Sequence, residues 1–203
     1  MYIALLGDSI FDNARYVPDE APVVKQLQSL LPRDSKAALL AVDGSVTTEV
    51  VSQVDRLPRD ATHLVISSGG NDALHASLSI GRSDGALEIL TIVQQEFRNN
   101  YRRLAHRLKK AGKPTVVCTI YDAVPNLEPW QRTALSVFND VIISEASRFG
   151  FPVIDLRPLC NEASDYSALS PIEPSSKGGM KIAKRISLVV KEFNFESPQT
   201  VLF

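Results

Sequence analysis

The chain has 203 residues, of which 44% are hydrophobic and 22% are charged, and its formal net charge is −1. This composition is typical of globular proteins, and the length suits one domain with a complete hydrophobic core, so we expect a single domain over residues 1–203. The near-zero charge gives no electrostatic footprint for nucleic acid or for an anionic membrane surface, and partners of those kinds are not expected.

The sequence shows no targeting or metal-binding signal. The first apolar run begins at residue 2, so we do not expect a signal peptide in the chain as given, and no apolar run approaches the roughly 18–20 residues that span a bilayer. The two cysteines, Cys118 and Cys160, lie far apart, and Cys118 falls in an apolar run typical of a buried reduced thiol. No Cys/His cluster has metal-ligand spacing. We therefore expect a cytoplasmic protein that needs no metal or organic cofactor.

Short apolar runs alternate with longer amphipathic runs along the chain, a pattern typical of a parallel sheet covered by helices on both faces. The predicted strands are Tyr2–Leu6, Ala37–Val42, His63–Ser67, Thr115–Ile120 and Pro152–Ile154. The predicted helices are Pro22–Leu31, Thr47–Arg56, Ala86–Ala111, Glu128–Phe149 and Gly179–Phe193. Strands with crossover helices in this order predict a three-layer α/β/α, flavodoxin-like fold with a five-stranded parallel sheet.

Two connections are long for such a fold. The segments Asp72–Ala86 and Asp155–Lys177 are predicted as loops, and their length favours functional loops over simple linkers. The first could serve as a lid or as an interface. The last segment, Glu196–Phe203, is expected to be a loosely held tail.

The strongest functional signal is the Gly-Asp-Ser-Ile motif at residues 7–10, which directly follows the first predicted strand. Gly7 permits a sharp turn that a residue with a Cβ atom would resist. Ser9 would then lie at the carboxyl end of a strand, where α/β folds bind their ligands, and it is a candidate nucleophile. Because these residues are also ordinary turn formers, the motif by itself slightly favours a simple loop.

Two further strand ends carry groups that suit the same site. The second strand is followed by Gly44, and the third runs into Gly-Gly-Asn-Asp at residues 69–72. Because the carboxyl ends of parallel strands meet at one edge of a sheet, Ser9, Gly44 and Asn71 are expected to converge. A serine, a backbone N–H and an amide N–H together form a nucleophile with an oxyanion hole.

In order and spacing, these three blocks resemble the first blocks of the SGNH (GDSL-type) hydrolase superfamily, and the similarity extends from residue 2 to about residue 190. The resemblance implies a flavodoxin-like fold and ester hydrolysis through an acyl-serine intermediate. It also implies that Ser9 is the nucleophile, and that the Ser9 N–H, the Gly44 N–H and the Asn71 side chain bind the oxyanion.

The last block of this family is altered in the chain. In the family it has an aspartate, two residues and then a histidine, shortly before a helix. Pro174, Ser175 and Gly178 fix the register here, which puts Glu173 at the histidine position and Ser170 at the aspartate position. The general base and the residue that orients it are therefore both replaced.

None of the three histidines is a convincing replacement. His63 begins the third strand and is expected at the end opposite the site. His106 lies inside a long predicted helix. His75 follows the oxyanion block closely, so it could approach the rim of a pocket.

Glu173 is the better candidate for the base. A carboxylate can accept a serine proton, but its reference pKa of about 4.3 makes it a weaker base than histidine, whose pKa is about 6.5. Burial beside Ile172 and Pro174 could raise the pKa of Glu173 and narrow the gap. The alternative is that Glu173 only hydrogen-bonds Ser9 or a backbone N–H, which would leave an impaired or inactive enzyme.

Several polar residues could support these groups from a second layer. Asp8 more readily ties down its turn through local hydrogen bonds than it attacks a substrate, and Asp165 could share a proton with Glu173. The supporting candidates are Asp8, Asp72, His75, Asp122, Asp165 and Ser170.

The sequence thus predicts a serine hydrolase that cleaves small carboxylic esters, such as a short-chain acyl ester or an O-acyl sugar, through an acyl-Ser9 intermediate. The alternative is a ligand-binding protein of SGNH fold that has kept the pocket and lost the base. A nucleotide-binding or electron-transfer protein of flavodoxin-like fold fits less well, because residues 7–10 place an acidic residue where a phosphate-binding loop would lie. The acyl group, the alcohol and the oligomeric state are not indicated.

Overall fold

Five parallel strands form the sheet of the computed structural model, which describes residues 1–81, 85–196 and 199–203. The strands are β1 (Tyr2–Gly7), β2 (Lys36–Leu39), β3 (His63–Ser67), β4 (Thr115–Cys118) and β5 (Val153–Ile154). Their order across the sheet is β2-β1-β3-β4-β5, so β2 lies on one side of β1 and the later strands follow one another on its other side. The predicted α/β class and flavodoxin-like sheet are confirmed.

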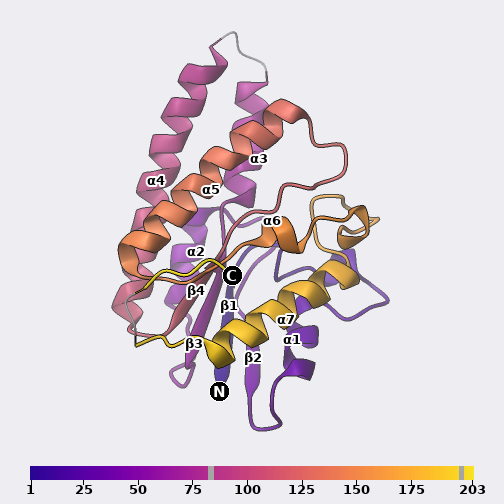
Figure 1. Cartoon of the computed structure of the whole chain (residues 1–203), viewed down its shortest axis with the longest axis vertical. Coiled ribbons are helices and arrows are strands. Elements are labelled where there is room, and N and C mark those ends of the chain that lie inside the picture. Colours follow the sequence, from indigo (N-terminus) through magenta and orange to yellow (C-terminus); the bar gives the residue numbers. More distant parts are fainter. Residues whose placement is uncertain (82–84, 197–198) are drawn as a thin grey trace.

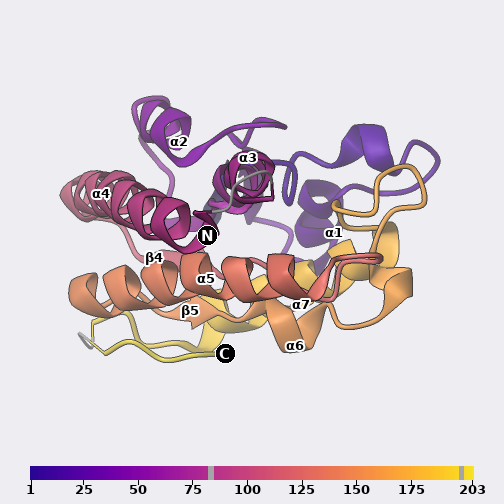
Figure 2. The same cartoon turned by 90° about the horizontal axis from the view of Figure 1, so that it is seen from above.

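Helices cover both faces of this sheet (Figures 1 and 2). The described part of the chain forms α1 (Val23–Leu30), α2 (Thr47–Val54), α3 (Gly70–Ile80), α4 (Ala86–Ala111), α5 (Pro129–Phe149), α6 (Leu156–Leu159) and α7 (Ser176–Glu192), with 3₁₀ turns at Ala14–Tyr16 and Ala163–Asp165. The packed pair α1 and α7 lies on one face, and α2, α4 and α5 lie on the other. Within the described ranges, no helix is both long and apolar enough to cross a membrane.

Each face of the sheet has its own hydrophobic core. Alternate residues of a strand point to opposite faces, so Leu6 packs under α2, α4 and α5, whereas Leu5 packs under α1 and α7. Both side chains are fully buried. A strand buried on both faces needs apolar residues at every position, which is why β1 appears in the sequence as a continuous apolar run.

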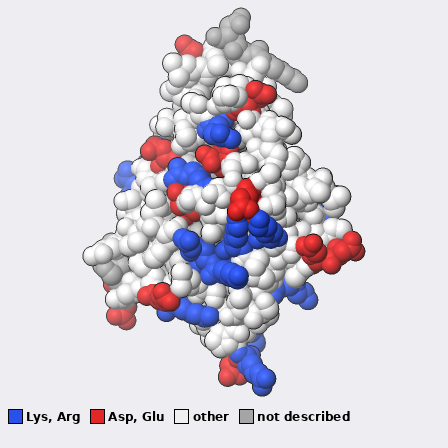
Figure 3. All heavy atoms as spheres, turned by 45° about the vertical axis from the view of Figure 1, so that its right-hand side comes forward, with Lys and Arg blue, Asp and Glu red and all other residues white. Residues whose placement is uncertain are grey.

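The surface carries both signs of charge. Figure 3 shows Lys and Arg side chains gathered near the middle of one face, with Asp and Glu side chains directly beside them. This face therefore forms no continuous basic surface, in keeping with the net charge of −1.

The prediction of a loop over Asp72–Ala86 was wrong at its start, because most of the described part of that segment belongs to α3. Leu74 and Leu78 of this helix are 42% and 59% exposed, and only Ala76 and Ile80 are buried. The helix therefore buries few residues, and the apolar stripe that would reveal it in a sequence is weak. Residues 82–84 of the predicted loop lie outside the described ranges.

The C-terminal end also differs from the expected loose tail. The N–H of Val153 donates to the Val201 carbonyl (2.8 Å), and the N–H of Phe203 donates to the Val153 carbonyl (2.8 Å). The N–H of Asp155 then donates to the Phe203 carbonyl (2.9 Å). The last residues thus pair in parallel with β5 on the edge that β4 leaves open.

A buried carboxylate connects α4 to α5. The side chain of Glu145 is fully buried and receives two hydrogen bonds from Arg102, at 3.0 and 2.8 Å. Arg98 and Arg148 lie 3.5 Å from the same carboxylate. The Arg102 hydrogen bonds are the main cause of the lowered pKa of Glu145. A charge buried in this way needs its partners, because removal of one partner leaves the other desolvated.

We predict that Glu145→Ala lowers the free energy of unfolding by about 1–3 kcal/mol, because it removes the buried acceptor of two hydrogen bonds from a charged donor. Urea denaturation measures this change. The matched control is Asp140→Ala, which removes a 69% exposed carboxylate 3.5 Å from Arg98 and should cost less than about 1 kcal/mol. Equal losses in the two variants would contradict a special role for Glu145.

Candidate active site

The turn after β1 depends on Gly7. Its φ of 131° is a backbone conformation that residues with a Cβ atom rarely adopt, and a Cβ atom at this position would overlap the carbonyl oxygen of Ser67 on β3. The Gln53 amide from α2 binds both backbone polar groups of Gly7: it accepts from the N–H at 2.7 Å and donates to the C=O at 2.8 Å. The direction in which the chain leaves β1 is thereby fixed.

Sequence reasoning did not single out Gln53. The signal was its spacing: Gln53 follows Val50 by three residues and precedes Val54, so it lies on the apolar face of the predicted helix Thr47–Arg56. In the structure Gln53 is 1% exposed. A polar side chain on a buried face must have hydrogen-bond partners, although the sequence does not tell which ones.

Asp8 ties down the same turn. Its carboxylate accepts hydrogen bonds from the N–H of Ile10 (3.2 Å) and from the hydroxyl of Ser67 (3.3 Å), and the residue is 2% exposed. Burial raises the pKa of Asp8 to about 7. Asp8 therefore keeps its proton at pH values at which an exposed aspartate is charged.

Of the groups that the sequence predicted to bind the oxyanion, Asn71 lines the same cavity as Ser9. Asn71 is the second residue of α3, and its amide donates one N–H to the Ser45 carbonyl (3.0 Å), which leaves the second N–H for another acceptor. Among the described residues, no acceptor pairs with the backbone N–H of Ser9 or of Gly44. Gly44 has a φ of 82°, so the turn that presents its N–H favours glycine.

Asp72, the residue after Asn71, connects α3 to α2. Its carboxylate accepts hydrogen bonds from the N–H (2.9 Å) and the hydroxyl (3.0 Å) of Thr47, and that hydroxyl also pairs with the Ser68 hydroxyl (2.8 Å). These bonds connect the start of α2 to the start of α3. Asn71 is therefore held next to the Gly44 turn by its own bond and by that of its neighbour.

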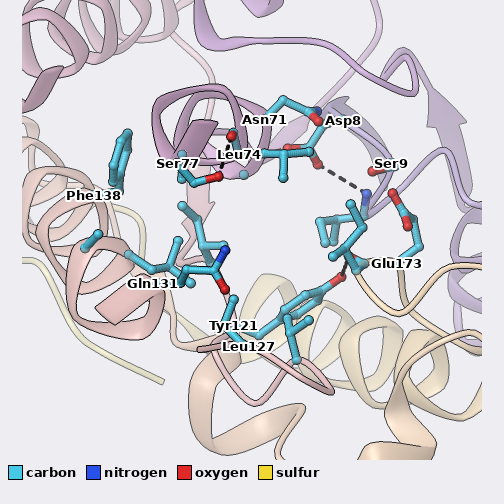
Figure 4. Close-up of a pocket in the computed structure, with 18 of the residues that line it drawn as sticks. Asp8, Ser9, Asn71, Leu74, Ser77, Tyr121, Leu127, Gln131, Phe138 and Glu173 are labelled. Atoms are coloured by element: carbon cyan, nitrogen blue, oxygen red, sulfur yellow. Dashed lines mark hydrogen bonds between the residues drawn. The ribbon is translucent and has the colours of Figure 1, made fainter. Parts of the chain in front are cut away.

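Glu173 lies in the loop before α7, and its backbone is fixed on both sides. The N–H of Ser167 donates to the Glu173 carbonyl (2.9 Å), and the N–H of Glu173 donates to the Ser170 carbonyl (3.2 Å). The hydroxyl of Tyr121 donates to the carbonyl of Ile172 at 2.6 Å. These bonds place the Glu173 side chain beside the hydroxyl of Ser9 (Figure 4).

The electrostatics of Glu173 differ from those of an exposed glutamate. The residue is 5% exposed, and burial raises its pKa, while hydrogen bonds from the hydroxyls of Ser170 and Ser9 lower it. Its Oε2 atom is buried without a hydrogen-bond partner. A buried carboxylate oxygen without a hydrogen-bond partner favours the protonated form of the group.

Two of the carboxylates predicted to support the site lie elsewhere. Asp165 does not share a proton with Glu173 as expected, because its carboxylate pairs with Lys181 of α7 at 2.7 Å. Asp122 does not line the cavity described below. The hydroxyl of Ser170, by contrast, reaches Glu173.

The three histidines lie away from Ser9 and Glu173. His63 stands at the amino end of β3, and its ring packs edge-on against Phe195 (5.4 Å between centroids). The ring of His106 packs against Phe149 (4.7 Å). His75 is exposed on α3 and is absent from the pocket wall, so it does not approach the rim as expected.

A cavity of about 130 Å³ extends from Ser9 between α3 and α5. Polar groups gather at one end, where Ser9 and Glu173 face it, and Phe138 lies at the opposite side (Figure 4). Its apolar wall consists of Ile10, Ala73, Leu74, Ile80, Ile120, Val124, Leu127, Ala134, Leu135, Phe138 and Ile172. The sequence did not reveal this wall. One side of the wall belongs to α3, which was not predicted, and the other side belongs to a face of α5 that is neither fully buried nor fully exposed.

The sequence of this chain matches the model of the GDSL-like lipase/acylhydrolase family over residues 5–178. No curated protein matches it significantly in sequence.

Several solved structures have the same fold. An acetyl xylan esterase, AlAXEase, superposes with a TM-score of 0.72 at 16% identity, over 94% of this chain and 100% of that one. The lipase Lip_vut3 from a goat rumen metagenome has a TM-score of 0.71 at 21% identity, over 92% and 96%. The psychrotrophic esterase EstA from Pseudoalteromonas sp. has a TM-score of 0.66 at 17% identity, over 95% and 99%. At these identities the likeness establishes a shared fold.

We predict that Asp8→Asn makes the protein more stable at pH 8 and leaves its stability nearly unchanged at pH 4. The pKa of Asp8 is raised from 3.8 to about 7, so the folded state keeps a proton that the unfolded state loses, and stability falls as the pH rises between these values. Asparagine keeps the acceptor for Ile10 and carries no charge. Urea denaturation should show a gain of roughly 2–4 kcal/mol at pH 8. Parallel stability curves for the two proteins would contradict this assignment.

Proposed function

We propose that this chain, which belongs to the GDSL-like lipase/acylhydrolase family, hydrolyses carboxylic esters through an acyl-Ser9 intermediate, with Glu173 as the general base. The observation that carries the proposal is the position of Glu173. Its buried carboxylate lies beside the Ser9 hydroxyl at the polar end of a cavity, and its Oε2 atom has no hydrogen-bond partner (Figure 4).

In the first half of the reaction, Ser9 Oγ attacks the carbonyl carbon of the ester and the Glu173 carboxylate takes the serine proton. The tetrahedral intermediate then collapses: the C–O bond to the alcohol breaks, and Glu173 gives the proton to the leaving oxygen. In the second half, Glu173 takes a proton from water, the resulting hydroxide attacks the acyl carbon, and the proton returns to Ser9 as the acid leaves.

The raised pKa of Glu173 supports its role as a base. A carboxylate with an ordinary pKa of about 4.3 holds a proton too weakly to compete with histidine, and burial reduces this disadvantage. The Ser170 hydroxyl, at the position where the family has an aspartate, donates to the carboxylate and orients it. A neutral donor suits a carboxylate base here, because an aspartate in its place would repel Glu173.

The N–H groups of Ser9 and Gly44 and the free amide N–H of Asn71 are proposed to bind the oxyanion. None of these donors is engaged by a protein acceptor among the described residues, and the hydrogen bond to the Ser45 carbonyl fixes the Asn71 amide before substrate arrives. Fixed donors of this kind stabilise a developing negative charge without reorganisation.

The main rival function is ligand binding without turnover. The replacement of the histidine and aspartate of the last family block by Glu173 and Ser170 favours it. Under this hypothesis the cavity binds an ester that Ser9 does not attack, so labelling of Ser9 by a serine-reactive fluorophosphonate separates the two functions.

We predict that Glu173→Gln lowers kcat for p-nitrophenyl butyrate by about 10²- to 10⁴-fold and abolishes fluorophosphonate labelling of Ser9, because glutamine cannot accept the serine proton. Ester turnover and intact mass spectrometry measure the two effects, and Ser9→Ala gives the background.

The matched control is Glu162→Gln, which changes an exposed glutamate before α7 that pairs with Lys177. It should keep near-normal activity. Normal activity of Glu173→Gln would refute the base assignment, and absence of labelling and turnover in the wild type would refute the esterase.

We predict that Asn71→Ala lowers kcat by about 10²- to 10³-fold with little change in KM, because the amide contributes mainly to binding of the transition state. Steady-state kinetics with the same ester measures both constants. A raised KM at unchanged kcat would instead indicate that Asn71 only binds the ground-state substrate.

A further inference from the structure

The cavity next to Ser9 is larger and more apolar than a small acyl group needs. Its volume of about 130 Å³ is roughly ten times the volume that accommodates one water molecule. An acetyl group would leave most of this space unfilled. An apolar space beside a reactive serine favours a ligand with an apolar chain.

The polar side chains beyond Ser9 have partners of their own. The Ser77 hydroxyl donates to the Leu74 carbonyl (2.7 Å), and the Gln131 side-chain oxygen accepts from the N–H of Glu128 (2.9 Å). The hydroxyl of Tyr121 is taken by the carbonyl of Ile172. The far part of the cavity therefore offers few free hydrogen-bonding groups to a ligand, whereas a site that binds a sugar needs many.

The direction of the cavity matches the geometry of the proposed reaction. It begins at Ser9 and ends against Phe138, a 2% exposed residue of α5 (Figure 4). An acyl carbon bonded to Ser9 Oγ, with its oxygen towards Asn71, leaves the rest of the acyl group to extend between α3 and α5. The alcohol part then leaves towards solvent.

Resting on the proposed function, we propose that the space between α3 and α5 is an acyl-chain site and that the preferred substrates are esters of linear medium-length acids, of about six to ten carbons. Phe138 sets the depth of the site, and Leu74 and Ala134 contribute its opposite walls. This specificity is distinct from deacetylation of a sugar.

The test is a series of p-nitrophenyl esters from acetate to decanoate. Each added methylene should raise kcat/KM by about twofold to fourfold until the cavity is filled, so octanoate should exceed acetate by at least tenfold. A preference for acetate would overturn the acyl-chain site and leave the esterase standing. Absence of activity towards every ester, acetate included, would overturn both the acyl-chain site and the esterase function.

Two neighbouring leucines of α3 give a matched pair of variants. Leu74→Ala should lower kcat/KM for octanoate about threefold or more and leave acetate unchanged, because Leu74 lines the cavity. Leu78→Ala changes a more exposed leucine one turn further along the same helix, outside the cavity wall, and should change neither ester. Equal effects of the two variants would overturn the assignment of the wall.

A second variant fills the site from α5. Ala134→Phe should lower kcat/KM for octanoate at least tenfold and keep acetate within about twofold, whereas Thr133→Phe, on the exposed side of the same helix, should change neither. A uniform loss over the whole ester series would contradict the proposal. If Ala134→Phe does not fold, the Leu74→Ala and Leu78→Ala pair decides the question.

Discussion

The candidate site depends on the two hydrogen bonds between the Gln53 amide and the backbone of Gly7. These bonds fix Gly7, which has no Cβ atom and can therefore lie close to β3. The direction of the chain at Gly7 then determines where Ser9 lies. The other end of α2 carries Thr47, which binds Asp72 at the start of α3. A single short helix thus positions both the turn that carries the proposed nucleophile and the amide that is proposed to bind the oxyanion.

Much of this arrangement could be predicted, because it follows from local rules. Apolar runs bounded by glycine gave the strands, and parallel strands necessarily bring Ser9, Gly44 and Asn71 to one edge of the sheet. The helix α3 was missed because only Ala76 and Ile80 of it are buried, which leaves a weak helical pattern in the sequence. The helix α3 packs against α4 and α5, and a local sequence pattern does not show these contacts.

The side-chain partners were the least predictable part. The register of the last block placed Glu173 near Ser9, but nothing local showed that Asp165 would pair with Lys181 instead. Likewise, the bond from Tyr121 to the Ile172 carbonyl joins residues 51 positions apart. Such long-range bonds determine the burial of Glu173, and burial is what raises its pKa and makes a carboxylate a useful base.

The proposed mechanism requires that the Glu173 carboxylate activates Ser9. The most direct measurement is the second-order rate of Ser9 phosphonylation by a fluorophosphonate as a function of pH. We expect a rate that rises through one titration above the ordinary glutamate pKa of about 4.3 and that is lost in Glu173→Gln. A rate that does not change over the acid range, or the same rise in Glu173→Gln, would contradict it.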